Sequence, residues 1–97
     1  MNEKQSVHFM KMSGDIGRGK EKEFEQTVRF VFNQLPDECI ERSLAQDIFN
    51  KGHYSFYSVW HDQNSLFSFL KSEEFQLIRG AFDSLGHFEN VINGKVV

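Results

Sequence analysis

The most constraining feature of this sequence is the order in which its hydrophobic period changes along the chain. Residues 6–12, "SVHFMKM", form a short apolar run of β-compatible residues, which predicts a first strand. From residue 20 the period becomes helical, and it ends at Pro36, because proline disfavours helical geometry in the residue before it. The apolar residues on this helical face are Phe24, Val28, Val31 and Leu35.

Two further strands, joined by a hairpin, are expected after this helix. Residues 39–48, "CIERSLAQDI", alternate in a strand pattern that places Ile40, Leu44 and Ile48 on one side. Residues 50–52, "NKG", are a hairpin signal, and residues 53–60, "HYSFYSVW", predict the third strand. Both faces of this third strand carry bulky apolar groups, so we expect both to be covered. One face holds Tyr54, Phe56, Ser58 and Trp60, and the other holds His53, Ser55, Tyr57 and Val59.

The remaining sequence predicts a broken helix and a final strand. Asp62 and Ser72 are both suitable N-cap residues, so the second helical region should break near residues 71–72. Gly86 should end it, and residues 87–97, "HFENVINGKVV", predict a fourth strand that is frayed by Asn93-Gly94. The order βαββαβ indicates an antiparallel sheet with the helices on one face. We therefore expect an α+β, ferredoxin-like fold that forms a single domain over residues 1–97.

Composition restricts the partners and the compartment. Eleven Phe, one Trp and two Tyr are a heavy aromatic load for a sheet with one wet face, so a partner surface is expected. A net charge of −3 disfavours nucleic acid and anionic membranes as partners. Cys39 has no second cysteine to pair with, and no apolar run approaches the ~18 residues of a membrane span. The N-terminal residues do not resemble a signal peptide, so a cytoplasmic protein without nucleic-acid or membrane partners is expected.

Residues 14–21, "GDIGRGKE", come close to a phosphate-binding loop. The pattern G-x-x-x-x-G-K-[ST] fits Gly14, Gly19 and Lys20, but Glu21 stands where a hydroxyl should hold magnesium. A carboxylate there would repel phosphates, and such loops belong to parallel sheets. The favoured interpretation is a glycine-rich turn between the first strand and the first helix.

The order βαββαβ also describes RNA-recognition motifs, which stack bases on aromatic residues of the third strand. Residues 51–57, "KGHYSFY", contain the expected Lys-Gly pair. The positions that should be aromatic are His53 and Ser55, however, and the first strand offers no clean second platform. RNA binding is therefore a minor alternative.

Residues 56–75, "FYSVWHDQNSLFSFLKSEEF", resemble the antibiotic biosynthesis monooxygenase-like family. Upstream, "GRGKEKEFEQ" is similar to the start of that family's first helix, with Phe24 as the buried anchor, and "DECIERSLAQD" is similar to its second strand. The resemblance implies a dimeric α+β barrel, in which two sheets pack face to face and each monomer keeps a pocket between sheet and helices. The matching residues of residues 56–75 are Trp60, Asp62, Leu66, Leu70, Ser72 and Phe75.

The sequence also departs from that family. Many members carry histidines at the positions that are Phe69 and Glu74 here, and many have Glu at the position of Ser58. The haem-degrading branch needs an Asn in the first strand, a Trp in the second helix and a His after it. The first strand here has no Asn, and the other two positions read as Phe69 and Arg79, so haem degradation is not expected.

Single residues offer no catalytic constellation. The four histidines and Cys39 lack metal-ligand spacing, so no metal site is expected. His8 is expected to be partly buried and bonded to backbone, and Arg42 to form an ion pair within its strand or at an interface. Cys39 has only acidic neighbours in sequence, which would raise its pKa, so it is not expected to be a nucleophile.

What remains is a functional expectation that the resemblance supplies. It implies a cofactor-independent monooxygenase-like protein that acts on, or binds, a small aromatic or quinol-type molecule in an apolar pocket. The alternative is a non-catalytic homodimer module or binding module that has lost the family's histidines. The small Ser58 would leave space in the pocket and the bulky Phe69 would fill it, so these residues do not decide between the two functions. The catalytic residues are unknown, and the candidate pocket residues are His8, Met10, Phe56, Ser58, Trp60, Phe69 and Phe82.

Overall fold

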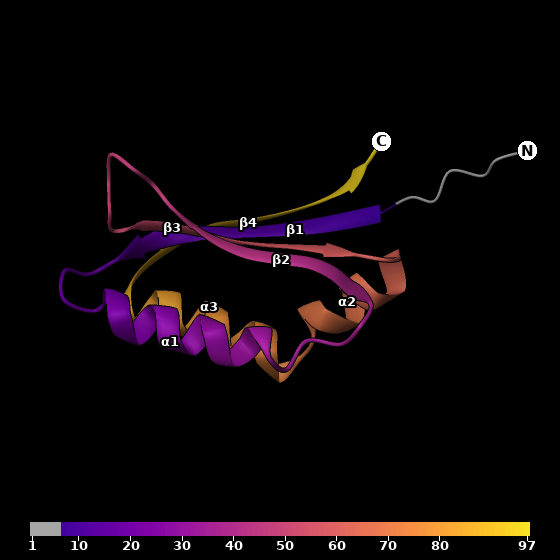
Figure 1. Ribbon diagram of the computed structural model, residues 1–97, viewed down its shortest axis with the longest axis horizontal. Coiled ribbons are helices and arrows are strands. Elements are labelled where there is room, and N and C mark those ends of the chain that lie inside the picture. The colour runs from indigo at the N-terminus through magenta and orange to yellow at the C-terminus, as the bar shows by residue number, and fades with distance from the viewer. Residues whose placement is uncertain (1–6) are drawn as a thin grey trace, which may run out of the picture.

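Four antiparallel strands form one sheet, and three helices lie against one of its faces (Figure 1). The computed structural model describes residues 7–97, and within them the sheet has the strand order β2-β3-β1-β4. This confirms the predicted ferredoxin-like α+β fold and the break in the second helical region. No helix in residues 7–97 is long and apolar enough to cross a membrane. The elements are β1 (Val7–Ile16), α1 (Glu21–Phe32), β2 (Cys39–Gln46), β3 (His53–Trp60), α2 (Gln63–Leu70), α3 (Glu73–Leu85) and β4 (Gly86–Val96).

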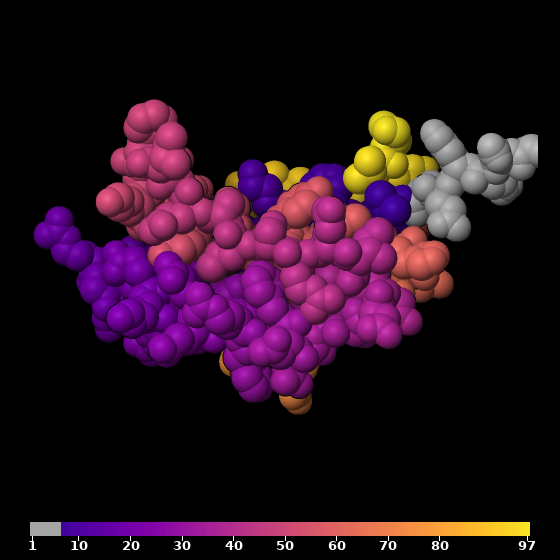
Figure 2. All heavy atoms as spheres, viewed as in Figure 1, coloured from indigo at the N-terminus to yellow at the C-terminus, as the bar shows by residue number. Residues whose placement is uncertain are grey.

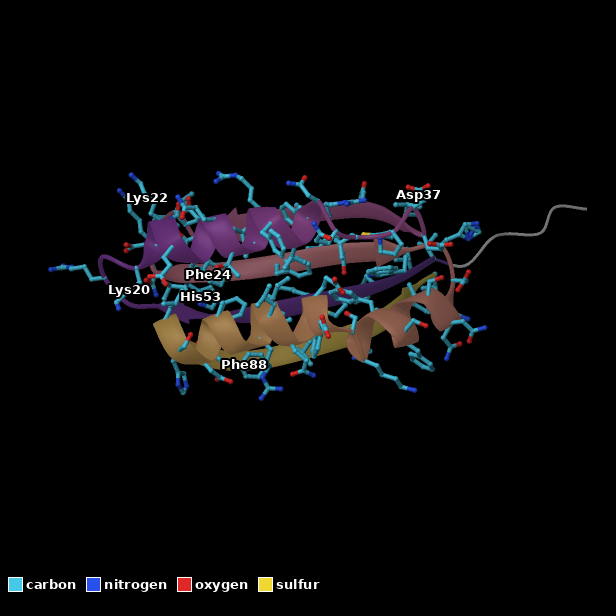
Figure 3. All side chains as sticks on the ribbon, turned by 90° about the horizontal axis from the view of Figure 1, so that it is seen from below. Lys20, Lys22, Phe24, Asp37, His53 and Phe88 are labelled. Carbon is cyan, nitrogen blue, oxygen red and sulfur yellow. The ribbon has the colours of Figure 1, made fainter. Side chains whose placement is uncertain are left out.

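The core lies between the sheet and the helices, and β3 supplies its centre. The four residues that the sequence placed on one face of β3 are all buried there, as predicted: Tyr54, Phe56, Ser58 and Trp60. From α1, Phe24 packs against Phe82 of α3 with ring centroids 4.7 Å apart. Figure 3 shows Phe24 pointing into the molecule, while Lys20 and Lys22 point outward. The helical period therefore sorts apolar from charged side chains as the sequence indicated.

Side-chain caps begin α2 and α3 at the predicted residues. The Ser65 amide donates to Asp62 Oδ1 over 2.8 Å, and the Phe75 amide donates to Ser72 Oγ over 3.2 Å. Each cap satisfies one of the amide groups that the first turn of a helix leaves without a partner. The second cap also fixes the place where the helical region breaks.

The glycine-rich stretch is a turn only from Gly17 onward, so the prediction is wrong for residues 14–16, which continue the first strand. Gly14 lies inside β1, and the remaining glycines form a turn before α1 in which Gly19 has a φ of 87°. The Gly19 amide donates to Glu21 Oε1 over 2.9 Å, so the carboxylate already uses an amide that a phosphate would need. The antiparallel pairing of β1 with both neighbours also differs from the sheet of a phosphate-loop protein.

Strand β4 stays paired with β1 through Val96, so the predicted fraying at Asn93-Gly94 is wrong. Gly94 pairs with Phe9, and a Cβ atom built there would come within 2.5 Å of Cε1 of the Phe9 ring. The glycine thus leaves room for an aromatic ring that lies over the strand, and it does not end the strand.

Strand β2 contains a bulge that the sequence did not reveal. Cys39 pairs with Trp60, but the next pair joins Glu41 to Val59, so Ile40 is an extra residue. The predicted apolar side of β2 is therefore wrong in part. Leu44 faces the helices, whereas Ile40 is 52% exposed and Ile48 lies beyond the strand, 81% exposed.

The face of the sheet opposite the helices also carries aromatic residues. Phe9 of β1 and Tyr57 of β3 stack there with ring centroids 6.0 Å apart, so the first strand does offer a second aromatic residue beside the third. On the same face Ile92 is 47% exposed. The β2–β3 hairpin projects on this side, away from the helices (Figures 1 and 2), and it carries Phe49, which is 92% exposed.

Candidate functional site

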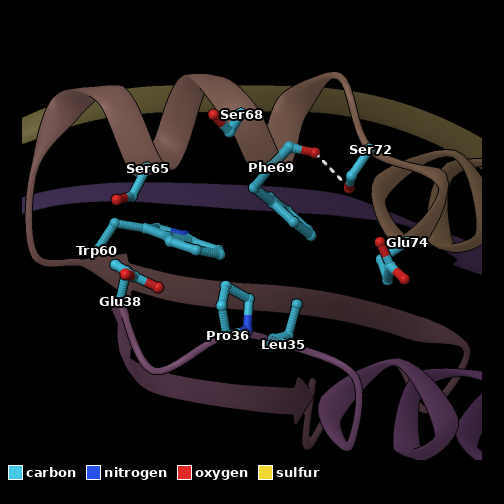
Figure 4. Close-up of a pocket in the computed structure, with 9 residues that line it drawn as sticks. All are labelled: Leu35, Pro36, Glu38, Trp60, Ser65, Ser68, Phe69, Ser72 and Glu74. Carbon is cyan, nitrogen blue, oxygen red and sulfur yellow. Dashed lines mark hydrogen bonds between the residues drawn. The ribbon is translucent and has the colours of Figure 1, made fainter.

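A cavity of about 370 Å³ opens beside α2, where the helical layer meets the connection between α1 and β2 (Figure 4). Three separate segments build its wall: the α1–β2 connection, the end of β3, and the broken helical region. Such a concave site between elements is a usual place for a small-molecule ligand. Its lining residues are Leu35, Pro36, Glu38, Trp60, Ser65, Ser68, Phe69, Ser72 and Glu74.

Two aromatic rings close the inner end of this cavity. The Trp60 and Phe69 rings stack with centroids 5.0 Å apart and an interplanar angle of 26°. The Trp60 indole N–H donates to Ser58 Oγ over 2.8 Å, which satisfies the one polar atom of the indole in the core. Trp60 is fully buried and Phe69 is 4% exposed, so a ligand meets these rings only at the deepest point.

Arg42 holds the wall formed by the α1–β2 connection. Its guanidinium donates to the Phe32 carbonyl over 2.6 Å and to the Cys39 carbonyl over 3.1 Å. These carbonyls stand at the two ends of the connection, one at the end of α1 and the other at the start of β2. Among residues 7–97 Arg42 therefore does not form the expected ion pair within its own strand. Its rigid fork instead fixes the connection at both ends.

The opposite wall depends on Ser72 at the break between α2 and α3. The Ser72 hydroxyl donates to the Phe69 carbonyl over 2.6 Å while it caps α3, as the dashed line in Figure 4 marks. This double use fixes the angle between the two helices. As a result Phe69 and Glu74, five residues apart in sequence, both face the same cavity.

The charged side chains that line the cavity are both acidic. Glu38 is exposed and Glu74 is half-buried, and the lining contains no Lys, Arg or His among residues 7–97. Figure 4 shows Glu38 beside Trp60, and Glu74 beyond Phe69. The two carboxylates thus stand at opposite ends of the aromatic pair.

The seven residues predicted for a pocket do not share one cavity. Trp60 and Phe69 line the cavity described above, whereas His8 lines a separate hollow of about 320 Å³ on the other side of α2. His8 Nδ1 is buried and has no hydrogen-bond partner in residues 7–97, so the expected bond to backbone is missing. The other four have no exposed surface and belong to the core: Met10, Phe56, Ser58 and Phe82.

Sequence reasoning did not place Leu35, Glu38 or Glu74 in the pocket. The available signal at Glu74 is its departure from the histidine that the family resemblance implies at this position. Leu35 packs against the core, as its place in the apolar stripe predicts, but α1 ends at Phe32, so Leu35 lies in the connection and also lines the cavity. Glu38 gave no signal, because an exposed acid beside a strand is the commonest kind of surface residue.

A third hollow, of about 340 Å³ between α1 and β2, contains a polar contact. The Tyr54 hydroxyl donates to Glu25 Oε2 over 2.5 Å and accepts from Gln46 Nε2 over 3.2 Å. Burial, together with the Glu25 carboxylate, raises the pKa of Tyr54 well above its usual range. The phenol therefore stays protonated near neutral pH and cannot serve there as a base.

Two other groups bear on the chemistry. Burial raises the pKa of the Cys39 thiol, and the Arg42 charge only partly opposes this, so the thiol is not activated. The predicted cause of the raised pKa, acidic sequence neighbours, is replaced by burial.

Ligand atoms of Asp15, His53 and Glu89 lie within 4.8 Å of one another, close enough to share a metal ion. Sequence spacing could not reveal this group because the strand pairing brings it together, and the 3.1 Å contact of His53 Nδ1 with Asp15 Oδ1 accounts for part of it without a metal.

Comparisons with known proteins agree with this architecture. Residues 15–81 match the model of the family described as "Antibiotic biosynthesis monooxygenase". A "putative antibiotic biosynthesis monooxygenase" from Bordetella bronchiseptica superimposes with a TM-score of 0.74 at 20% identity, over 96% of this chain and 99% of that one. A conserved protein from Methanosarcina mazei gives a TM-score of 0.78 at 15% identity, over 95% and 92% of the two chains. No curated protein matches the sequence.

Proposed function

Because the chain belongs to the antibiotic biosynthesis monooxygenase family, we propose that it binds a small, flat aromatic molecule in the Trp60 cavity and oxygenates it without a cofactor. The observation that carries this proposal is the cavity of about 370 Å³, whose inner end is formed by the rings of Trp60 and Phe69. Stacked rings favour a flat ligand, because aromatic groups pack face to edge or offset at such distances. Monooxygenation without a cofactor requires an organic substrate that itself supplies all four electrons that reduce O₂, two for the oxygen atom that is inserted and two for the atom that leaves as water.

A second candidate function is a non-catalytic module, and the packing of Phe69 favours it. The Phe69 ring contacts Trp60, Phe56 and Phe75, with centroids between 5.0 and 6.3 Å apart. It therefore fills space between α2 and β3 that a smaller or polar side chain would leave open. In this second reading the cavity is only the outer remnant of a site, and the protein acts through its assembly.

An oxygen-uptake assay separates the two candidates. Anthrone is a suitable flat probe, since its methylene group can be oxygenated to anthraquinone with the release of one water for each O₂ consumed. The monooxygenase proposal predicts O₂ consumption and anthraquinone formation above the uncatalysed rate, and predicts a large loss in a Trp60→Leu variant that still folds. A rate equal to that of buffer, together with no quenching of Trp60 fluorescence by anthrone, would leave the non-catalytic module.

We further propose that the open face of the sheet packs against a second copy of this chain in the cytoplasm. The stacked Phe9 and Tyr57 rings and the exposed Ile92 make this face apolar enough for an interface. The β2–β3 hairpin, which carries the exposed Phe49, projects on the same side of the sheet as this face (Figure 1). A second copy would cover these groups and account for the aromatic excess of the sequence.

Light scattering during size exclusion tests the dimer. Ile92→Glu should shift the protein toward monomer, because it places two like charges near the proposed two-fold contact. Leu77→Glu is the matched control, since Leu77 is exposed to a similar degree, 44% against 47%, but lies on α3. A monomeric mass for the unaltered protein at micromolar concentration would refute the dimer.

A further inference from the structure

We infer that the Trp60 cavity selects ligands that carry a positively charged amine, and this inference rests on the proposed function of that cavity as the ligand site. The lining supplies two carboxylates, from Glu38 and Glu74, and no basic side chain among residues 7–97. A ligand carboxylate or phosphate would therefore meet only like charge. A ligand ammonium group would meet opposite charge at either end of the cavity.

Among residues 7–97, no side chain forms a salt bridge or hydrogen bond with the carboxylate of Glu38 or Glu74. The basic side chain of the adjoining wall is Arg42, whose guanidinium donates to the Phe32 and Cys39 carbonyls. The salt bridges of residues 7–97 join His53 to Asp15 and Arg79 to Asp83, so neither involves Glu38 or Glu74. Both charges are thus available to a bound ligand.

The positions of the two carboxylates fit an aromatic amine. Glu38 lies beside Trp60, and Glu74 lies beyond Phe69, so each end of the ring pair has one carboxylate (Figure 4). An apolar ring of the ligand would contact Leu35, Pro36 and the edge of Phe69. Its ammonium group would then reach one carboxylate directly, and the half-buried position of Glu74 makes that site the less screened by water.

Three probes of nearly the same size test the charge preference: benzylamine, benzyl alcohol and benzoate. Trp60 is the only tryptophan of the chain, so its fluorescence reports on the cavity itself when excited away from the probes' absorption. Near pH 7 and low salt, benzylamine should bind about tenfold more tightly than benzyl alcohol, which is the expected size for two partly exposed charges. Benzoate should bind more weakly than the alcohol, and about 0.5 M salt should weaken only the amine.

Isosteric variants assign the effect to the cavity. Glu74→Gln should remove most of the preference for benzylamine over benzyl alcohol, and Glu38→Gln with Glu74→Gln should abolish it. Glu73→Gln is the matched control, because Glu73 lies in the same first turn of α3 but does not line the cavity. It should keep the preference, and thermal melting should show that all variants fold.

The outcomes separate this inference from the function on which it rests. Equal binding of benzylamine and benzyl alcohol would overturn the amine preference and leave the cavity as a site for neutral aromatic ligands. A preference that survives in the Glu38→Gln, Glu74→Gln double variant would overturn it as well, since the charge would act from elsewhere. Failure of all three probes to bind would refute both the inference and the proposed ligand site.

Discussion

Replacing Arg42 by Met should destabilise the protein by about 2–3 kcal/mol. The change keeps the aliphatic stem but removes the two donors that reach the Phe32 and Cys39 carbonyls over 2.6 and 3.1 Å. A hydrogen bond to a charged group contributes about 1.5–3 kcal/mol, and the partial exposure of Arg42 lowers the contribution of the pair below the sum of two such bonds. Arg42→Lys should recover less than half of this loss, because a single ammonium cannot reproduce the fork.

Urea denaturation followed by Trp60 fluorescence measures this loss. With a slope of about 1–1.5 kcal/mol per molar urea for a chain of this size, the midpoint should fall by roughly 2 M. Arg18→Met is the control, since Arg18 lies in the exposed turn before α1 and donates no hydrogen bond among the interactions of residues 7–97. It should leave the midpoint within about 0.5 M.

A second measurement, the binding of aromatic probes, tests the role of Arg42 in shaping the cavity. Release of the connection should also weaken the binding of aromatic probes, because Leu35, Pro36 and Glu38 lose their fixed position. If Arg42→Met and Arg18→Met shift the urea midpoint equally, the two carbonyl bonds do not hold this wall, and the reasoning is refuted.

Three further predictions follow from packing, titration and the missing haem ligand. Gly14→Ala should destabilise the fold by about 1–3 kcal/mol, because its Cβ would lie 2.7 Å from the Phe82 ring and 2.6 Å from a carbonyl oxygen. Gly80→Ala should stabilise the fold by about 0.5–1 kcal/mol, because a Cβ there has open space around it in α3. Thermal melts that rank the two variants in the opposite order would contradict this. The pKa of Tyr54 is raised in the folded state, so its hydrogen bonds stabilise the fold below the ordinary tyrosine pKa of about 10 and lose this effect as pH rises further. The difference in unfolding free energy between the unaltered protein and Tyr54→Phe should therefore shrink between pH 9 and about pH 11. A constant difference over this range would exclude the linkage. Titration with haem should give no Soret shift of a ligated iron, because Arg79 stands at the expected ligand position and its guanidinium lies over the Phe88 ring at 4.0 Å. A Soret shift that an Arg79 variant abolishes would contradict the assignment of Arg79 to this position.

Local signals were sufficient for most of the fold. The two faces of β3 follow from strict alternation, and Asp62 and Ser72 identify two helix starts, because each pattern depends only on residues close in sequence. The bulge at Ile40 could not be predicted in this way. It depends on how β2 pairs with β3, and a strand pattern shifts by one residue without any local mark.

The site was less predictable than the fold for a related reason. Its two carboxylates come from positions 36 residues apart, Glu38 before β2 and Glu74 at the start of α3, and each looks like an ordinary surface acid. The capped break at Ser72 fixes one of these segments and the fork of Arg42 fixes the other, and the fold then places both at one cavity. The aromatic wall was easier, because Trp60 and Phe69 lie in the segment with the strongest resemblance to a known family.

The strand order also bears on how the chain folds during synthesis. β1 is made first, yet one of its two neighbours in the sheet is β4, the last strand to be made. Until residues 86–96 leave the ribosome, one edge of β1 has unpaired amide and carbonyl groups over ten residues. A nascent chain in this state can pair with the same edge of another chain, so its tendency to aggregate should be highest before β4 is available to pair with β1.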